Sequence, residues 1–494
     1  NNGNLAVNLV YPHDDNGVYA TFGVTSGKWY WEAKCTSAGN RGQVGVTDAG
    51  HKSGSNSGYN YSVATRHTGG TGDTSGTSNS NLDAVIDSGN WVTFCFDADN
   101  GQIWYSREAA PNISGTANVT GLTLGSGREW KPHIRETGNP VSNFTFNFGA
   151  SAAGFKYGPP NADYKPLNAA NLPEPTIKKG SDHFLTKTYS GTGSTQTITT
   201  GLDADLVWVK RHNATQYHII ANTISGAGSY LVPHEQDQES DGGSQLINGF
   251  NSTGFQVGTE AAVNANGGSY VSWNWKESAS AGFDIVSDTG TGSDKTVSHG
   301  LGVKPDMMIR KARGRSDNWV VYHKHMDGAD ATEYLEFNTD NGQQNYHEIW
   351  NDTAPTSSVF SVGSDASVNE DGTGYLTFLF SSVAGYSKVG MYNANNSDNG
   401  PFVYTGFAPS WIMIKNRDST GPWNIFDTKR ETYNPREKNL RANTSAGEDS
   451  ARYIDFLSNG FKLRNHGTEM NDPDGAEYLY LAFADTSFKY ANAQ

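Results

Sequence analysis

Apolar and polar residues alternate in short stretches along most of this chain. In residues 28–35 the alternation is strict, and it places Trp29, Trp31, Ala33 and Cys35 on one face. A period of two residues is that of a β-strand with one buried face. No long segment has the 3.6-residue apolar period of a helix, and no run of about 18 apolar residues marks a membrane span. The pattern therefore predicts an all-β protein with little helix.

The first 150 residues contain several such strands separated by turns. Residues 92–97 and 102–105 flank Asn100-Gly101, a pair that favours a tight hairpin turn. Regularly spaced short strands with turn residues between them are typical of a two-sheet sandwich. We expect one sandwich domain over residues 1–150.

Residues 182–494 contain one sequence pattern three times. We name the copies repeat 1 (residues 182–279), repeat 2 (280–383) and repeat 3 (384–494). Each copy begins with a Gly- and Ser-rich or Asn-rich turn, continues with an apolar run that ends in Lys, and closes on an aromatic strand. A unit of this length is a small domain, because solenoid units span about 20–50 residues. We expect three separate β-domains in series.

Between the sandwich and the repeats lies a stretch rich in proline and without strand periodicity, residues 151–181. Proline in a segment without alternation is typical of a semi-rigid connector. We therefore expect a linker here.

Charge and composition narrow the class of protein. The 494 residues carry 36 Lys and Arg against 51 Asp and Glu, a net charge of −15. A generally acidic surface repels phosphate backbones, so we expect no nucleic-acid partner. The two cysteines, Cys35 and Cys95, are compatible with free buried thiols or with one disulfide. The chain opens without Met, and we expect residues to precede Asn1.

Motifs that resemble metal or phosphate sites have simpler explanations. Asp97-x-Asp99-x-Gly101 looks like the start of a calcium loop, but its twelfth position, Glu108, follows a strand. A structural calcium ion there is the open alternative to a hairpin turn. Residues 289–296 imitate a phosphate-binding loop, yet no Gly precedes Lys295 and no helix pattern follows.

Other candidate chemistry is also absent from the pattern. His323, His325 and His347 occur in one copy without equivalents in the others, so we expect no metal site. No nucleophile motif occurs in a strand–turn–helix context. The sequence predicts no catalytic residues, no cofactor and a protein that is not an enzyme.

A long insertion in the sandwich, residues 52–81, is rich in Gly, Ser, Thr and Asn and carries Tyr59, Tyr61, Arg66 and His67. Long loops in compact domains are often functional, and Tyr, Ser, Gly and Asn are typical of binding loops. We take these four side chains as the candidate binding residues; a solvated spacer is the alternative.

The first 150 residues resemble the SPRY family of concanavalin-like β-sandwiches. The resemblance is carried, in order, by Gly27-Lys-Trp-Tyr-Trp-Glu32, Val44-Gly-Val46, Phe96-Asp97 with Gly101-Gln-Ile-Trp104, and Asn147-Phe-Gly149. It implies a non-catalytic binding module whose loops contact partners.

The rest resembles virion structural proteins of tailed bacteriophages. The matching segments are Leu167–Pro175, Gly400–Phe407, Leu481–Asp485 and Phe488–Asn492. This resemblance implies a virion protein, a fibre-like or appendage subunit that attaches to a host-surface glycan or protein, contacts other virion proteins and forms a homo-oligomer, with a trimer favoured. A capsid-decorating protein without receptor binding and a polysaccharide depolymerase are the alternatives.

Overall fold

A computed structural model of the chain separates into two compact units, Asn1–Pro173 and Glu174–Gln494. Both consist mainly of strands, which confirms the predicted all-β class. The structure describes residues 4–7, 16–19, 23–24, 26–38, 42–48, 60–64, 86–120, 122, 130–136, 143–149, 154–168, 171, 175–326, 331–467 and 469–486. Helix within these residues is confined to single turns, namely α1 Ala261–Asn264, α2 His347–Trp350, α3 Ala366–Asn369, η2 Gly180–Asp182, η3 Gly243–Gln245 and η4 Ala279–Ala281.

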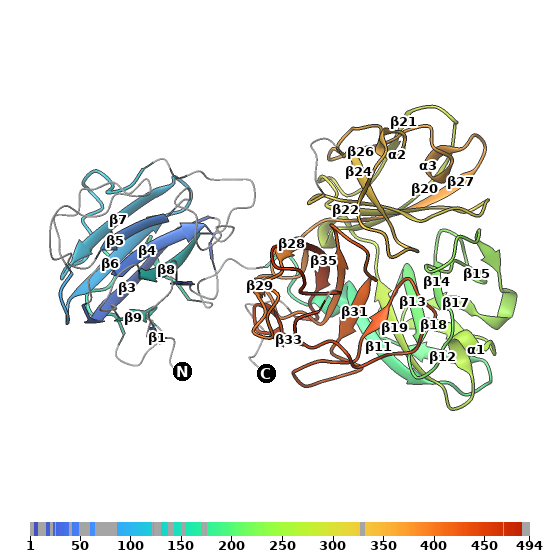
Figure 1. The fold of residues 1–494 in the computed structure, drawn as a ribbon, viewed down its shortest axis with the longest axis horizontal. Coiled ribbons are helices and arrows are strands. Elements are labelled where there is room, and N and C mark those ends of the chain that lie inside the picture. The colour runs from blue at the N-terminus through green and yellow to red at the C-terminus, as the bar shows by residue number, and fades with distance from the viewer. Residues whose placement is uncertain are drawn as a thin grey trace. The chain divides into compact units, whose positions relative to one another are not determined.

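The first unit is a sandwich of two sheets (Figure 1). One sheet has the order β1-β9-β3-β6-β7 with β10 added to β3, and the other has the order β2-β8-β4-β5. The strands are β1 Asn4–Val7, β2 Asn16–Tyr19, β3 Lys28–Ser37, β4 Gly42–Asp48, β5 Asn60–Ala64, β6 Trp91–Asp97, β7 Gln102–Arg107, β8 Trp130–Glu136, β9 Asn143–Asn147 and β10 Lys165–Pro166. The β6–β7 hairpin turns at Asn100-Gly101, as predicted.

Alternation along β3 and β6 decides what each face of the first sheet buries. Trp29, Trp31, Ala33 and Cys35 all lie in the core between the two sheets, which confirms their predicted shared face. Cys95 instead pairs with Tyr30 and packs on the opposite face of the same sheet. Because the two cysteines lie on opposite faces of the sheet, they do not form a disulfide, and both are buried.

The outer face of this sheet is covered by residues 154–168, which we call the strap. Glu32 is fully buried and accepts hydrogen bonds from the backbone N–H groups of residues 156, 157 and 158 at 2.7, 2.8 and 3.1 Å. The Tyr30 hydroxyl donates to the same carboxylate at 2.8 Å. A buried carboxylate needs such donors. The pattern of residues 151–181 had suggested a connector. The strap instead packs on the sandwich.

In the second unit each repeat pairs one large antiparallel sheet with one small sheet. The large sheets have the orders β11-β19-β13-β14, β20-β27-β22-β23-β24-β25 and β28-β35-β30-β31-β32, and the small sheets β12-β18-β17, β21-β26 and β29-β34-β33. Repeat 1 contains β11 Phe184–Ser190, β12 Gln196–Thr199, β13 Leu206–Arg211, β14 His218–Asn222, β15 Ser229–Tyr230, β16 Ser240–Asp241, β17 Ile247–Asn251, β18 Gly254–Val257 and β19 Ser269–Trp275.

Repeats 2 and 3 follow a similar order, except that in repeat 2 the helix α2 precedes β26, whereas a strand, β17 or β33, precedes the equivalent β18 or β34. Repeat 2 contains β20 Phe283–Thr289, β21 Lys295–Ser298, β22 Met307–Ala312, β23 Val320–His323, β24 Glu333–Glu336, β25 Gln344–Asn345, β26 Val359–Val362 and β27 Gly374–Phe380. Repeat 3 contains β28 Ser387–Asn393, β29 Phe402–Tyr404, β30 Trp411–Asn416, β31 Asn424–Asp427, β32 Leu440–Arg441, β33 Ile454–Leu457, β34 Gly460–Leu463 and β35 Glu477–Phe483.

The three large sheets turn one face toward a single shared core, and Figure 1 shows the green, yellow-to-orange and red repeats around a common centre. Trp275, Phe380 and Phe483 end the equivalent strands β19, β27 and β35. Their rings contact one another, with centroid distances of 6.5, 6.0 and 6.2 Å around the triangle. The repeats thus form one closed body and not the separate domains in series that the sequence suggested. Each repeat alone would expose this aromatic face to water.

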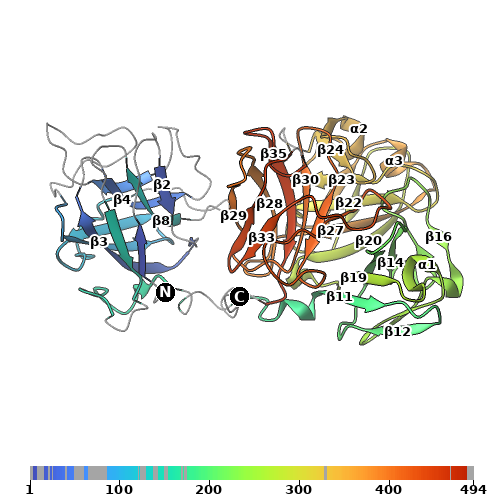
Figure 2. The same cartoon turned by 60° about the horizontal axis from the view of Figure 1, so that its bottom comes forward.

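The small sheets lie outside this arrangement. Between the large and the small sheet of each repeat is a second, smaller apolar core, with Phe255, Phe360 and Phe461 at equivalent places. Figure 2 shows β12 at the periphery of the second unit. Every large sheet is therefore buried on both faces.

A buried asparagine fixes the opening turn of each repeat. Its side-chain oxygen accepts a backbone N–H from the turn at 2.8–2.9 Å, in the pairs Asn264 with Thr192, Asn369 with Thr291, and Asn471 with Asn395. The Asn-rich turn of repeat 3 therefore has the same bonding as the Gly-rich turns of the other copies. The asparagine is the local reason why three different turn sequences fold alike.

Buried lysines connect the repeats to one another in a cycle. Lys311 of repeat 2 donates to the Gln236 carbonyl of repeat 1 at 3.0 Å, and Lys415 of repeat 3 donates to the Asp340 carbonyl of repeat 2 at 3.2 Å. Lys210 of repeat 1 completes the cycle by donating to the Ser445 carbonyl of repeat 3 at 3.1 Å. All three lysines are 0% exposed. Burial lowers the pKa of Lys311 and Lys415 to about 8, and burial, with the Arg211 charge, lowers that of Lys210 to about 7.

Candidate binding surface

The structure does not describe the side chains of the four predicted binding residues. Tyr59, Arg66 and His67 lie outside the described residues, and so does the Tyr61 side chain. The Tyr61 backbone belongs to β5 and pairs with Val46 of β4. A contact role for this loop stays a prediction.

The calcium-like turn of the sandwich uses its carboxylates internally. Asp97 accepts the backbone N–H groups of Asp99 and Asn100 at 3.1 and 3.0 Å, and Asp99 accepts that of Gly27 at 2.8 Å. Burial raises the pKa of Asp97, but hydrogen bonds from Asn100 and the Lys28 charge outweigh burial, so the net pKa lies below the usual value. The hairpin turn accounts for both carboxylates.

The phosphate-like turn of repeat 2 is equally occupied. The Thr291 N–H donates to the Asn369 side chain at 2.9 Å, and the Gly292 N–H donates to the Asn369 carbonyl at 2.7 Å. The Lys295 ammonium lies 2.7 Å from the Asp288 carboxylate. The groups that would hold a phosphate therefore hold the turn, as predicted.

The histidines of repeat 2 do not converge. The rings of His323 and His325 lie 5.7 Å apart, whereas His347 is exposed on α2. Within the described residues, no group of three or more His, Cys, Asp or Glu side chains is placed to hold a metal ion.

The shared core contains a cavity of about 20 Å³, lined among others by Trp208, Trp319 and Trp411. Its lining has no exposed polar atoms. A space of this size could hold one water molecule, but water requires polar partners. The cavity therefore offers no site for a ligand.

Repeat 3 carries the most exposed large apolar side chain among the described residues. Tyr433 is 83% exposed, against 53% for Tyr217 in repeat 1 and 41% for Tyr346 in repeat 2. It lies on residues 428–439, which connect β31 to β32 and which we call the Tyr433 loop. Measured between equivalent ladder residues, this connection (Asp427 to Leu440) is one residue longer than that of repeat 2 (His323 to Leu335) and four longer than that of repeat 1 (Asn222 to Leu231). Loops on a rigid scaffold commonly carry binding residues.

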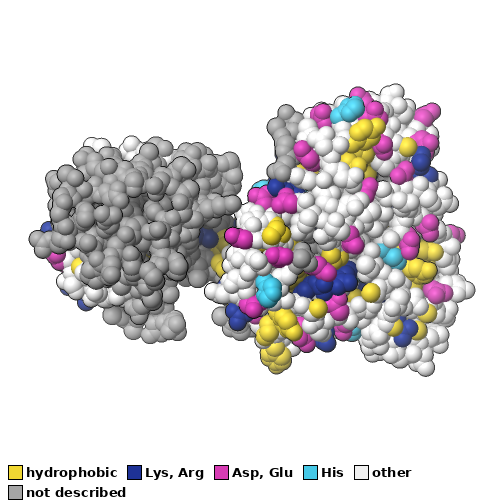
Figure 3. Space-filling view, viewed as in Figure 1, with side chains coloured by type: hydrophobic (Ala, Val, Ile, Leu, Met, Phe, Trp, Pro, Cys, Tyr) yellow, Lys and Arg dark blue, Asp and Glu magenta, His cyan; other side chains and the backbone are white. Residues whose placement is uncertain are grey.

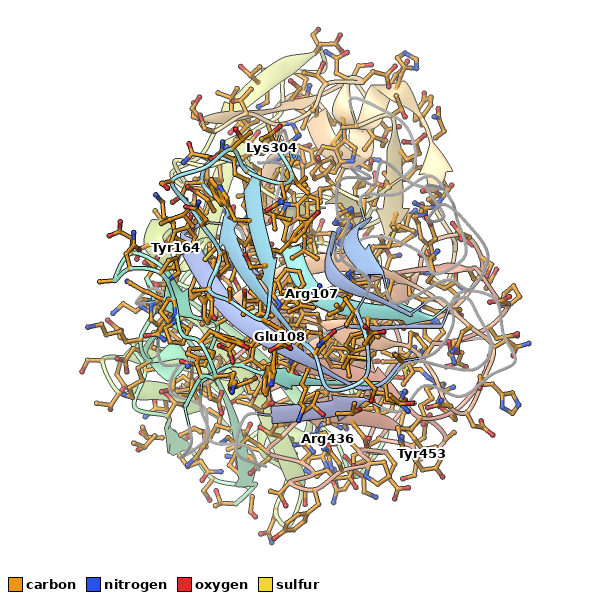
Figure 4. The ribbon with its side chains drawn as sticks, turned by 90° about the vertical axis from the view of Figure 1, so that its left-hand side faces the viewer. Arg107, Glu108, Tyr164, Lys304, Arg436 and Tyr453 are labelled. Atoms are coloured by element: carbon orange, nitrogen blue, oxygen red, sulfur yellow. The ribbon has the colours of Figure 1, made fainter. Side chains whose placement is uncertain are left out.

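The Tyr433 loop is held along the edge of the small sheet. Asn434 both donates to and accepts from the backbone of Phe456, at 2.7 and 2.9 Å. The Arg436 guanidinium, labelled in Figure 4, lies 4.7 Å from the centre of the Phe456 ring. Burial lowers the pKa of Arg436, while Glu431, Asp427 and Asp455 act in the opposite direction. The residues that follow Tyr433 are thus fixed.

A buried ion pair fixes the base of the same loop. The Arg430 Nε donates to Asp427 Oδ2 at 2.7 Å, and both side chains are almost fully buried. Arg430 also donates to the Lys438 carbonyl at 2.8 Å. Glu431 accepts the Lys438 N–H at 3.0 Å. A rigid loop loses less conformational entropy when it binds a partner than a mobile loop does.

The exposed ring of Tyr433 is suited to contact with a partner. Tyr433 offers a flat ring with a hydroxyl, which gives contact area and a hydrogen-bonding group at little entropy cost. Figure 3 shows acidic side chains spread over the visible face of the repeats, with basic ones among them. None of the described helices is long and apolar enough to cross a membrane.

Sequence reasoning missed the Tyr433 loop. The available signal was Tyr433-Asn-Pro435 between the charged residues 429–431 and 436–438, in a place where the other copies are shorter. Exposure of the ring depends on contacts with β33, which alternation alone does not reveal.

Comparison with known proteins gives one family match. A family model described as a domain of unknown function, DUF7483, matches residues 179–487, so it covers all three repeats as one unit. Among solved structures, the SPRY domain of human HERC1 is similar to part of this chain. The similarity covers 30% of this chain and 88% of that domain's chain, with 16% sequence identity and a TM-score of 0.21. No curated protein matches the chain. Because the family model covers more than half of the residues, the chain belongs to the DUF7483 family.

Proposed function

We propose that this chain is a non-enzymatic virion protein of a tailed bacteriophage, a fibre-like or appendage subunit that attaches to a glycan of the host surface. The observation that carries the attachment role is the Tyr433 loop, where a ring that is 83% exposed stands on a segment braced by buried groups. Binding residues are commonly presented by loops on a rigid scaffold.

The construction of the second unit supports the same role. The three repeats form one scaffold through their shared core and the cycle of buried lysines. The buried contacts recur in every repeat, whereas the exposed side chains differ between repeats. Tyr217, Tyr346 and Tyr433 are exposed at positions that are not equivalent. A symmetric interior with a varied exterior allows one repeat to carry a contact without changing the fold.

The phage assignment rests on the resemblance of the repeat segments to virion proteins. In such proteins several weak contacts add up when subunits assemble, because linked sites raise the effective concentration. A homo-oligomer, with a trimer favoured, and contacts with other virion proteins belong to this proposal. The sandwich loop with Tyr59, Tyr61, Arg66 and His67 would be a second contact.

Replacement of one ring tests the attachment role. We expect Tyr433→Ala to weaken binding to immobilised bacterial lipopolysaccharides and capsular polysaccharides by at least about tenfold, about 1.4 kcal/mol, which is the usual effect of losing an aromatic anchor. The melting temperature should stay unchanged, because the ring is mostly exposed. Tyr217→Ala is the matched control and should bind like the wild type.

Two other results would replace this proposal. Shortening of a capsular polysaccharide by the purified protein would indicate a depolymerase. Equal binding by the wild type and the Tyr433→Ala variant, with all surfaces inert and the protein bound to capsids, would indicate a structural virion protein.

A further inference from the structure

The three junctions between repeats are built from equivalent backbone hydrogen bonds. Between repeats 1 and 2, Glu239 N–H donates to the Arg313 carbonyl and Asp317 N–H to the Gln236 carbonyl, at 3.0 and 2.8 Å. Between repeats 2 and 3 the equivalent donors are Gln343 and Gly421, at 2.7 and 2.8 Å. Between repeats 3 and 1 they are Glu448 and Gln216, at 2.8 and 2.9 Å. We call this last junction the seam, because the chain does not run directly from repeat 3 to repeat 1.

Repeat 1 has histidine where the other repeats have groups that do not titrate near neutral pH. The strand registers and the cross-junction bonds align His212 with Arg313 and Arg417, His218 with Trp319 and Trp423, and His234 with Asn338 and Asn443. His212 and His218 face the seam, and His234 packs beside His218. Three substitutions of one kind at one junction distinguish the seam from the other two junctions.

His218 takes the place of a tryptophan only while it is neutral. Trp319 and Trp423 each donate their indole N–H to a backbone carbonyl of the neighbouring repeat, both at 3.2 Å. The His218 Nδ1 accepts the Trp208 indole N–H at 2.9 Å, which leaves the proton on Nε2, near the Arg441 and Thr444 carbonyls of repeat 3. If Nδ1 also carried a proton, its N–H would face the Trp208 indole N–H, and neither group could accept a hydrogen bond from the other.

The surroundings of His218 oppose a charge. The ring is 0% exposed, and Lys210 and His234 are the titratable groups that face it, with the Trp273 ring on its other side. Burial, then Lys210 and His234, holds the pKa of His218 well below its usual value, although the Arg441 and Thr444 carbonyls act against this shift.

His234 is enclosed in the same way. Its ring stacks on Tyr217 at 5.6 Å and meets the His218 ring at 5.9 Å. Burial, then the Lys210 charge, lowers its pKa to about 4. The Glu235 carboxylate lies 3.6 Å away and is half-exposed, so it compensates a charge on His234 only weakly.

One histidine of the seam acts in the opposite direction. His212 lies 3.1 Å from the Glu448 carboxylate, which also lies 3.3 Å from Arg430, so protonation of His212 strengthens this contact. Two buried rings that oppose protonation outweigh one partly exposed pair. A second buried pair, His323 and His325, faces Arg417 near the junction of repeats 2 and 3, where the chain itself also joins the repeats.

We propose that the seam is an acid-sensitive clasp, in which protonation of His218 and His234 separates repeat 3 from repeat 1 while the other two junctions stay closed. Separation exposes part of the shared aromatic core. This inference does not depend on the attachment role, because it concerns only how the body opens.

Hydrogen exchange of the full chain at pH 7.5 and 5.0, corrected for the intrinsic rate at each pH, tests the clasp. A histidine with a usual pKa near 6.5 that cannot be protonated in the closed state favours opening by about thirtyfold at pH 5. We therefore expect the amides of Gln216 and Glu448 to lose protection by at least that factor. The equivalent amides of Glu239, Asp317, Gln343 and Gly421 should change little.

Variants that copy the other junctions add a second test. The double variant His218→Trp with His234→Asn should keep the seam amides protected at pH 5, and the control His323→Asn should not. If the double variant fails to fold, the wild-type comparison of the three junctions still decides. Equal loss at all three junctions, or no loss at the seam, would overturn the proposal.

Discussion

In repeats 1 and 3 a tyrosine hydroxyl donates to the carbonyl that precedes the buried asparagine, whereas in repeat 2 an arginine does so. Tyr189 donates to the Val263 carbonyl and Tyr392 to the Met470 carbonyl, both at 2.7 Å. In repeat 2 the Arg310 guanidinium donates to the Val368 carbonyl at 2.9 and 2.8 Å.

The arginine comes from a different strand than the tyrosines. The position of Tyr189 and Tyr392 is occupied in repeat 2 by Asp288, whose carboxylate holds Arg310 at 2.7 Å. The guanidinium also lies 4.4 Å from the centre of the Tyr375 ring, where the other repeats stack two tyrosines. The buried carbonyl requires a donor in each copy, but either strand can supply it if both positions change together.

Among these predictions, replacement of Arg310 should lower the free energy of unfolding most. We expect Arg310→Val, the residue of repeat 1, to lower the free energy of unfolding by about 3–5 kcal/mol, because the Asp288 carboxylate, which is only 13% exposed, loses its main partner. The measurement is chemical denaturation of the full chain.

The double variant Arg310→Val with Asp288→Tyr is the matched control. It rebuilds the pair of repeat 1 and should recover most of the loss, since Lys295 is partly exposed and tolerates the missing carboxylate. Additive losses in this cycle would show that the two arrangements are not equivalent.

A smaller effect is expected for the tyrosines. Tyr189→Phe keeps the stacked ring but leaves the Val263 carbonyl without its donor, at a cost of about 1–3 kcal/mol. Tyr392→Phe should cost a similar amount in repeat 3. Exposed Tyr217→Phe serves as the control and should change the free energy of unfolding by less than about 0.5 kcal/mol.

The smallest expected effect is on the pH dependence of stability. Burial raises the pKa of Asp288, but Arg310 and Lys295 outweigh burial and hold it below the usual value. Its contribution to stability is therefore complete above about pH 4 and is lost as the pH falls further. The double variant should lose less stability between pH 4 and pH 3 than the wild type does, and an identical pH profile would contradict the role of the ion pair.

Much of this fold could be predicted from alternation and repetition. The face shared by Trp29 and Trp31, the Asn100-Gly101 hairpin and the equivalent strands of the three copies all follow from local pattern. Closure of the repeats could not be predicted, because the inward face of each large sheet looks like any apolar face. The signals were present in the apolar residues on both faces of β35 and in the Lys that ends each apolar run. Only the packed structure shows that each Lys donates to the preceding repeat of the cycle, with repeat 1 donating to repeat 3.

The candidate binding surface was less predictable. Exposure of Tyr433 results from long-range bonds of Asn434 and Arg436 with β33, and such bonds leave no periodic trace in the sequence. Of the predicted contact loop of the sandwich, residues 52–81, the structure describes only the backbone of residues 60–64.

The central claim is that the three repeats unfold as one body, and calorimetry of the full chain tests it most directly. We expect two transitions, one for each compact unit, with the transition of the repeats having equal calorimetric and van't Hoff enthalpies. Separate melting of the repeats, or a stable fold of residues 182–279 alone, would contradict the shared core.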